Sequence, residues 1–125
     1  MPVINELNNL GDLLKYEAPN MYSRDQATVA AGQNLPIGAV VGRNTATAKL
    51  NAVNPTANDG TEVAVGVLAS NVDASLIDRE DAILIARHAI VARNALVWPA
   101  GVTAAQKATA IAQLESRGIL VREGV

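Results

Sequence analysis

The sequence contains no cysteine, no phenylalanine, one tryptophan, two tyrosines and one histidine among its 125 residues. Without cysteine the chain forms no disulfide, has no thiolate nucleophile and offers no thiolate ligand to zinc. A single imidazole excludes metal sites built from several histidines. We therefore expect no metal site of either kind. The core must consist of Ala, Val, Ile and Leu, which bury little area per residue, so we expect modest stability as a monomer and a gain from association.

No sign of charge dominates the chain. Ten Lys and Arg residues face twelve Asp and Glu residues, which gives a net charge of -2. A nucleic-acid partner is not expected, because binding one requires a basic surface. The N-terminus lacks the basic start and apolar run of a signal peptide. The longest charge-free stretch, residues 26–42, is interrupted by Gly and Pro, so we expect no membrane partner either. At 50% hydrophobic residues the chain should fold, as one domain.

The charges are unevenly distributed along the sequence. Residues 1–25 carry a net -2, residues 26–81 a net -3 and residues 82–125 a net +3. A surface polarised in this way suits subunits that meet head to tail in a ring. The alternative, which the sequence leaves open, is that these blocks form no patches on the surface.

Residues 1–25 differ from the remainder of the chain. Five aliphatic residues fall near helical spacing with Gly11 among them: Ile4, Leu7, Leu10, Leu13 and Leu14. A weak amphipathic helix is one interpretation. We favour the other, an extended N-terminal arm that lacks a core of its own and finds its apolar partner on another molecule. On that interpretation, removal of residues 1–20 leaves a folded domain.

From residue 26 onwards the pattern is typical of β-structure. Short strands are predicted at 28–30, 39–41, 49–51 and 62–69, a turn at 33–38 and a solvated charged loop at 78–81. In the fourth strand Val63, Val65 and Val67 alternate, and Gly66 allows a close backbone approach. The apolar run 82–92 predicts a buried strand or a bent pair of strands, with a break at Arg87–His88.

One helix is predicted near the C-terminus, at about residues 103–117. Thr103 and Gln106 form a capping box, and residues 104–117 contain no helix breaker. Gly118 supplies the left-handed turn, and Ile119 reaches back to Leu114. A closing strand follows at 119–122. Residues 26–125 are therefore expected to form a mainly β domain with a C-terminal α-helix.

A catalytic site is hard to find in the sequence. His88 is the only imidazole that could act as a base, and no Gly-x-Ser-x-Gly turn presents a serine nucleophile. Because His88 lies within an apolar run, a structural histidine with one hydrogen bond is the better interpretation. The acidic residues at 78–81 lack the spacing of a calcium loop. The pattern favours a structural protein, not an enzyme.

The order of several motifs resembles the phage lambda head decoration protein family. Residues 62–69 (Glu-Val-Ala-Val-Gly-Val-Leu-Ala) are similar to the family's Ala-Val-Gly-Ile-Leu-Ala segment. Residues 96–99 (Leu-Val-Trp-Pro) resemble its Leu-Trp-Pro segment, with Val97 as an extra residue. The capped helix with residues 118–121 is similar to its C-terminal helix and strand. Residues 22–25 and 28–32 look like the start of its ordered domain. The resemblance covers about residues 22–125.

This resemblance implies a β-clip-like fold and a homotrimer. Trimers would bind the major capsid protein at three-fold sites on the outer surface of the virion capsid. There they would cement the expanded head against the pressure of packaged DNA, without catalysis or cofactor. The protein would be made in the host cytoplasm. Two alternatives stay open: a trimeric structural module of a phage tail or fibre, and a small hydrolase or ligand-binding β domain built around His88.

The residues expected to act in this role fall in two groups. Residues 1–25 form the capsid-binding arm, which adds a strand to a sheet edge of the capsid protein. Its apolar contact residues are Leu13, Leu14, Tyr16, Met21 and Tyr22. Trp98 and Pro99 are candidates for the trimer interface, because a large aromatic side chain is typical of interface hot spots. Packing of Trp98 in the core is the competing interpretation.

Overall fold

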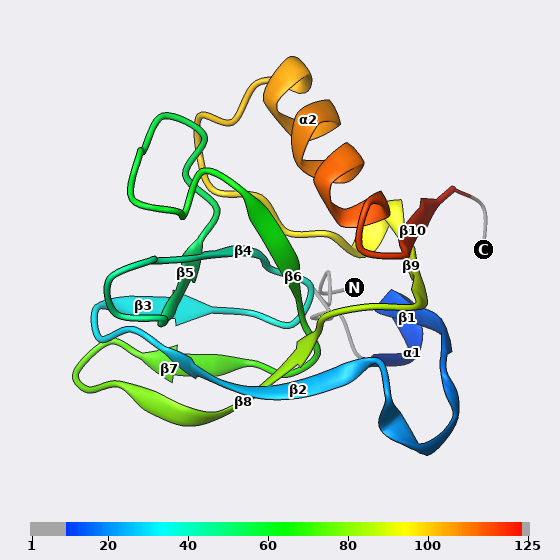
Figure 1. The fold of residues 1–125 in the computed structure, drawn as a ribbon, viewed down its shortest axis with the longest axis horizontal. Helices are drawn as coiled ribbons and strands as arrows, with labels where there is room; N and C mark the ends of the chain where they lie inside the picture. The colour runs from blue at the N-terminus through cyan, green and yellow to red at the C-terminus, as the bar shows by residue number, and fades with distance from the viewer. Residues whose placement is uncertain (1–9, 124–125) are drawn as a thin grey trace, which may run out of the picture.

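The computed structural model describes residues 10–123, and its largest unit is a closed five-stranded barrel (Figure 1). Around the barrel the strands are β2 (Arg24–Val29), β5 (Leu50–Ala52), β4 (Val40–Arg43), β6 (Ala64–Leu68) and β8 (Arg79–Ile85). Neighbours pair antiparallel except β2 and β5, which are parallel. The predicted mainly β fold is confirmed. The closure into a barrel has no counterpart in the sequence prediction.

Two smaller sheets flank the barrel. In the first, β9 (Ala89–Ala92) lies between β1 (Leu14–Glu17), to which it is antiparallel, and β10 (Ile119–Arg122), to which it is parallel. In the second, β3 (Gln33–Leu35) pairs with β7 (Val72–Ala74). The run 82–92 supplies the end of β8 and all of β9, so its predicted break at Arg87–His88 is confirmed. This turn carries the chain from the barrel into the first small sheet.

The C-terminal helix is α2 (Ala104–Glu115), and it packs against β6 and β10. Its predicted capping box is present. The Thr103 hydroxyl accepts a hydrogen bond from the Gln106 N–H at 3.1 Å, and the Gln106 side chain accepts one from the Thr103 N–H at 2.9 Å. Gly118 has a φ of +80°, as its predicted turn requires. The remaining helical segments are short: α1 (Leu10–Leu13), η1 (Pro19–Met21) and η2 (Arg93–Ala95).

Aliphatic residues form two main buried clusters. One lies inside the barrel and includes Val29, Leu50, Leu68 and Leu84. The other lies between α2, the first small sheet and the barrel wall, and it includes Leu114 and Ile119 together. At Gly66 an added Cβ would stand 2.5 Å from the Ile85 carbonyl oxygen, so the close backbone approach predicted there is confirmed. Small side chains therefore allow the strands and the helix to approach one another closely.

Two segments predicted as irregular are strands. Residues 33–35, predicted as part of a turn, form β3 because they pair with β7, a partner that a local pattern does not reveal. Residues 79–81, predicted as a charged loop, begin β8, and all three of their side chains are exposed. The charge in this segment reflects the solvent-facing end of a barrel strand. In both places pairing between distant segments overrides local propensity.

The prediction of an arm without a core has to be corrected for residues 10–25. Leu13 is completely buried in the cluster next to α2, and Leu10 and Leu14 pack against the same cluster. The helical spacing of these leucines reflects burial against the chain's own domain. β1 pairs with β9, and β2 begins at Arg24. Residues 1–9, with Ile4 and Leu7, lie outside the described residues. A truncation of residues 1–20 would remove Leu13 from this cluster, so we now expect it to destabilise the domain.

Candidate binding surface

The loop between β1 and β2 exposes the largest apolar side chains of the N-terminal region. Met21 is 64% exposed and Tyr22 is 54% exposed, and Tyr16 on β1 is 54% exposed. Single exposed apolar residues are ordinary on a protein surface, whereas several close together in sequence mark a contact site. We call residues 18–23 the 18–23 loop. It carries two of the five predicted contact residues.

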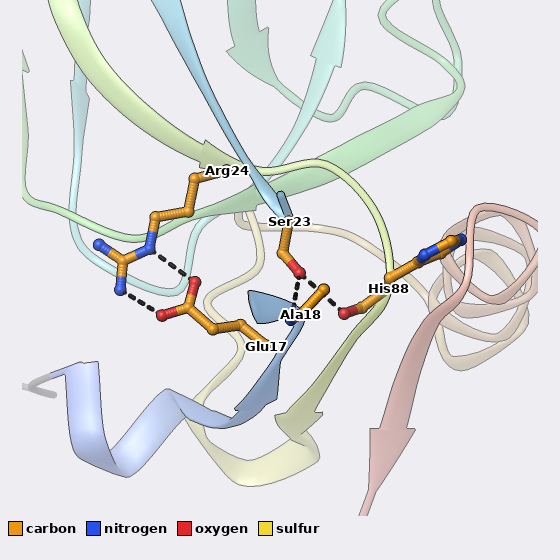
Figure 2. A network of polar contacts seen from close by, with 5 residues as sticks. All are labelled: Glu17, Ala18, Ser23, Arg24 and His88. Atoms are coloured by element: carbon orange, nitrogen blue, oxygen red, sulfur yellow. Dashed lines mark hydrogen bonds and ion pairs between the residues drawn. The ribbon is translucent and has the colours of Figure 1, made fainter. Parts of the chain in front are cut away.

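A buried serine holds the 18–23 loop against the rest of the domain (Figure 2). Ser23 is completely buried. Its hydroxyl accepts a hydrogen bond from the Ala18 N–H at 2.9 Å and donates one to the His88 carbonyl oxygen at 2.8 Å. One side chain thus closes the loop on itself and ties it to the β8–β9 turn. Because both backbone groups are paired through it, the loop's base is fixed in position.

An ion pair braces the same loop from its flanking strands. The Arg24 guanidinium donates two hydrogen bonds to the Glu17 carboxylate, both at 2.7 Å (Figure 2). This bidentate arrangement is the strongest geometry for such a pair. The hydrogen bonds from Arg24 lower the pKa of Glu17 below its ordinary value of 4.5. The last residue of β1 and the first of β2 are thereby joined across the loop.

Arg87 supports Tyr22 from the β8–β9 turn. It donates a hydrogen bond to the Tyr22 carbonyl oxygen at 2.7 Å and another to the Asp25 carboxylate at 2.5 Å. Its guanidinium carbon lies 5.3 Å from the centre of the Tyr22 ring, within the range of a cation–π contact. The His88 ring lies against the same tyrosine, with 5.3 Å between ring centres. Tyr22 is therefore presented in a fixed orientation although half of its surface is free.

Backbone strain is concentrated around this loop. Asn20, Met21 and His88 have φ values of 61°, 58° and 48°, in the left-handed region that side-chain-bearing residues rarely adopt. Each such residue costs on the order of 1–3 kcal/mol, which the surrounding contacts must offset. Strain of this kind gathers where a surface has to keep one shape for a partner.

The other predicted site residues are placed differently. Leu13 serves the chain's own core, so it is corrected from a surface contact residue to a core residue. Leu14 is partly buried against the same core. Trp98 is half-buried against that cluster, with the Lys107 ammonium 6.0 Å from its ring centre, and Pro99 beside it is half-exposed. The trimer contact at Trp98 and Pro99 stays a prediction.

Reasoning from the sequence missed the residues that hold the loop. Ser23, Arg24 and Arg87 were not singled out as site residues, because nothing in the sequence indicates their contacts and their partners lie up to 65 residues away. His88 was expected inside an apolar environment. Its side chain is exposed instead, because the positive φ at this turn directs it out of the core. Only the arrangement of β1, β2 and β9 brings these residues together.

The surface offers little that catalysis or metal binding requires. Ser23 and His88 are in contact, yet the serine hydroxyl is bonded to the histidine backbone carbonyl and the imidazole plays no part in that bond. The pair therefore does not form a nucleophile and base. Within residues 10–123, no group of three His, Asp or Glu side chains could hold a metal ion, and no helix is long and apolar enough to cross a membrane.

Comparison with known proteins gives one family. The family model described as bacteriophage lambda head decoration protein D matches residues 3–119. The match spans the barrel, the sheet of β3 and β7, the 18–23 loop and α2, and it ends at the first residue of β10. Among curated proteins, none matches the chain.

Proposed function

Because the chain belongs to the bacteriophage lambda head decoration protein D family, we propose that it binds the expanded phage head as a homotrimer and cements neighbouring capsomers. Members of this family are structural proteins of the phage capsid. The chain is accordingly a phage head decoration protein, and we propose that it acts as a structural component of the virion and not as an enzyme. The finer points, which are the trimer, its three-fold sites, the major capsid protein as partner and resistance to the pressure of packaged DNA, form the proposal. The protein would be made in the host cytoplasm before it joins the head.

The family match over residues 3–119 is the observation that carries this proposal. The geometry of the 18–23 loop adds the place of contact. Met21 and Tyr22 are exposed, and a buried serine, a bidentate ion pair and Arg87 hold the loop that carries them. A surface ordered before binding loses little conformational entropy when it meets its partner. We therefore place Met21, Tyr22 and the neighbouring Tyr16 against the capsid protein.

The N-terminal segment has a second part in the proposal. β1 lies at an edge of its sheet, so one side of its backbone is not paired with a neighbouring strand of that sheet. Exposed edges accept an additional strand, and an extended segment adds one to the edge of another protein. We propose that residues 1–9, together with the edge at β1, join this domain to a sheet of the capsid protein. Leu10, Leu13 and Leu14 hold this segment to its own domain.

Three copies of a weak contact suffice for stable decoration. Ordering a segment costs roughly 1–2 kcal/mol per residue, so a single contact of this kind is weak. When one subunit of a trimer is bound, the contacts of the other two become intramolecular, and avidity rises by about 10²–10⁴-fold. Neighbouring capsomers held by one trimer are thereby held to each other. This is the physical meaning of cementing.

Co-sedimentation with purified phage particles tests the proposal. The full chain is mixed with expanded empty heads of the phage that encodes it and, separately, with purified tails, and the pellets are quantified. We expect saturable binding to heads and none to tails. Binding to tails alone would overturn the proposal in favour of a tail or fibre module, and binding to neither would overturn both.

A truncation then tests the N-terminal segment. Removal of residues 1–9 leaves Leu10, Leu13 and β1 in place, so the remaining domain should fold. We expect the truncated protein to keep the unfolding temperature of the parent and to sediment with the same number of subunits. We expect it to bind heads at least tenfold more weakly. Full decoration by the truncated protein would remove this segment from the proposal.

A further inference from the structure

The turn between β7 and β8 exposes the most prominent apolar side chains outside the 18–23 loop. Leu76 is 92% exposed and Ile77 is 61% exposed, side by side in residues 75–78. We call these four residues the 75–78 turn. Two adjacent aliphatic side chains with this exposure contribute little to the core of their own subunit. Their burial against another surface is favourable because it removes apolar area from water.

Two carboxylates hold the 75–78 turn in shape. Asp73 accepts hydrogen bonds from the N–H and the hydroxyl of Ser75. Asp78 accepts one from the Ala31 N–H at 2.8 Å and forms an ion pair with Lys49 at 2.6 Å. The turn is therefore fixed at both ends, and it presents its aliphatic pair as a rigid projection. Binding through such a projection requires little additional ordering.

A hollow of about 340 Å³ lies elsewhere on the same molecule. Its apolar lining comes from Val65, Leu84 and Ala86, and its charged lining from Arg43, Arg87, Arg117 and Asp25. The hollow opens to the surface, so side chains of another molecule can enter it. We call these seven residues the arginine hollow. Its exposed lining is mainly polar with an excess of positive charge, and its small apolar part comes from Val65 and Ala86 because Leu84 is buried.

The two surfaces are complementary in charge. Glu80 and Asp81 follow the 75–78 turn at the exposed start of β8, and neither carboxylate has an ion-pair partner among residues 10–123. At the hollow, the guanidinium groups of Arg43 and Arg117 likewise have no partner in that part of the chain. The acidic residues beside the turn therefore complement the positive charge of the hollow, and Val65 and Ala86 offer a small apolar contact for the tip of the turn.

The position of these surfaces excludes their meeting within one subunit. β8 runs from the 75–78 turn at residue 79 to the hollow side at residues 84–87. Seven strand residues span roughly 20 Å. Figure 1 shows the β7–β8 turn at the left edge of the molecule and the loop between β1 and β2 at the lower right. A contact between two different surfaces is head to tail, and it closes into a ring when the rotation permits.

We propose that the 75–78 turn of one copy inserts Leu76 and Ile77 into the arginine hollow of the next copy. Glu80 and Asp81 then face Arg43 and Arg117 across the contact. Three such contacts close the ring, and this inference rests on the homotrimer of the proposed function. It assigns subunit assembly to the 75–78 turn, and the contact lies next to the 18–23 loop because Arg87 lines the hollow and also holds Tyr22.

Sedimentation velocity of the full chain tests the contact without any phage particle. The variant Leu76→Ser/Ile77→Ser removes the apolar tip, and because both side chains are exposed its unfolding temperature should stay within a few degrees of the parent's. We expect association at least 100-fold weaker, hence a monomer at concentrations where the parent is a trimer. The control Leu76→Met/Ile77→Val keeps an apolar tip and should stay trimeric.

A mixing experiment tests the head-to-tail geometry. The variant Arg43→Glu/Arg117→Glu has an intact turn and a damaged hollow, and alone it should be monomeric. Mixed with Leu76→Ser/Ile77→Ser, which has an intact hollow, it should form a dimer with one native contact. The inference would be overturned if Leu76→Ser/Ile77→Ser were trimeric at the concentration at which the parent is trimeric. It would also be overturned if the mixture of the two variants stayed monomeric. A parent that is trimeric but fails to bind heads would instead overturn the proposed function.

Discussion

The two exposed apolar regions at the ends of the β2–β8 pair are built in different ways. The 18–23 loop lies where Arg24 pairs with Ile85, and the 75–78 turn lies beyond the pairing of Val29 with Arg79. The first is held by groups from distant parts of the chain, and left-handed residues are concentrated there. The second is held mainly by its flanking carboxylates, and none of its four residues has a positive φ.

This difference indicates two kinds of contact. A strained loop braced by buried groups keeps a specific shape that an unconstrained chain would not adopt, which suits recognition of a partner with its own fixed surface. A relaxed turn with an aliphatic tip needs only a hollow to fill, which suits a contact between identical subunits. The predictions below compare the two ends, from the largest expected effect to the smallest.

The largest effect on stability is expected at Leu13, in the segment that precedes the 18–23 loop. Leu13→Ala creates a cavity in the main core cluster, and we expect the free energy of unfolding to fall by about 2–5 kcal/mol. The matched variant Tyr16→Ala, on the exposed face of the same segment, should change it by less than about 0.5 kcal/mol. Urea unfolding followed by circular dichroism measures both. Equal effects would mean that this segment is not part of the core.

A serine at each end gives a second comparison. Ser23→Ala leaves the Ala18 N–H and the His88 carbonyl without their buried partner, and we expect a loss of about 1–3 kcal/mol together with weaker binding to heads. Ser75→Ala, at the exposed turn, should lower the stability of the subunit by less than about 0.5 kcal/mol. Chemical denaturation and head pelleting test the pair, and comparable losses from both would remove the distinction between the ends.

Because the backbone at Met21 is strained, replacing this residue by glycine should raise stability and weaken head binding. A residue other than glycine in the left-handed conformation destabilises the folded protein by about 1–2 kcal/mol, and glycine removes that strain. Glycine loses more conformational entropy on folding, which cancels about 0.5–1 kcal/mol of the gain. Met21→Gly should therefore raise the free energy of unfolding by up to about 1 kcal/mol while it weakens head binding. Ile77→Gly, where no strain is relieved, should give no such gain. A Met21→Gly variant that is destabilised would show that the loop is not strained.

The smallest effect concerns pH. Arg24 lowers the pKa of Glu17 in the folded protein, so the carboxylate contributes stability that is present above its unfolded value of 4.5 and is lost as the pH falls through the folded value. Below pH 4.5 the stability of Glu17→Gln should therefore decline less steeply than that of the parent. At the other end, hydrogen bonds from Lys49 and Ala31 lower the pKa of Asp78, so Asp78→Asn should also flatten the decline, below about pH 3.8. Thermal unfolding from pH 3 to 7 measures both slopes, and parallel curves for parent and variants would contradict the assignment.

The sequence predicts what depends on neighbours along the chain. The capping box at Thr103, the turn at Gly118 and the break at Arg87–His88 are all local, and all are confirmed. The predicted alternation of Val63, Val65 and Val67 is wrong, because Val63 is exposed whereas Val67 and its neighbours in β6 are buried. The prediction failed where the partner is distant. Leu13 looked free because the other residues of its core cluster begin 24 residues further along the chain, at Ile37, and residues 33–35 looked irregular because β7 supplies their pairing.

The candidate surface was predictable only in part. Met21 and Tyr22 stand out in a sequence with few large side chains, so they could be identified from composition. Ser23, Arg24 and Arg87 are common residue types, and only tertiary contact gives them their role. Leu76 and Ile77 were missed because two aliphatic residues before a charged segment are also typical of an ordinary strand.

One comparison tests most directly whether the 18–23 loop binds the capsid and the 75–78 turn joins the subunits. Met21→Ser/Tyr22→Ser and Leu76→Ser/Ile77→Ser are each analysed by sedimentation velocity and then pelleted with expanded heads. We expect the first variant to sediment as a trimer with head binding reduced at least tenfold, and the second to sediment as a monomer. A Met21→Ser/Tyr22→Ser trimer that decorates heads as fully as the parent does would contradict the account.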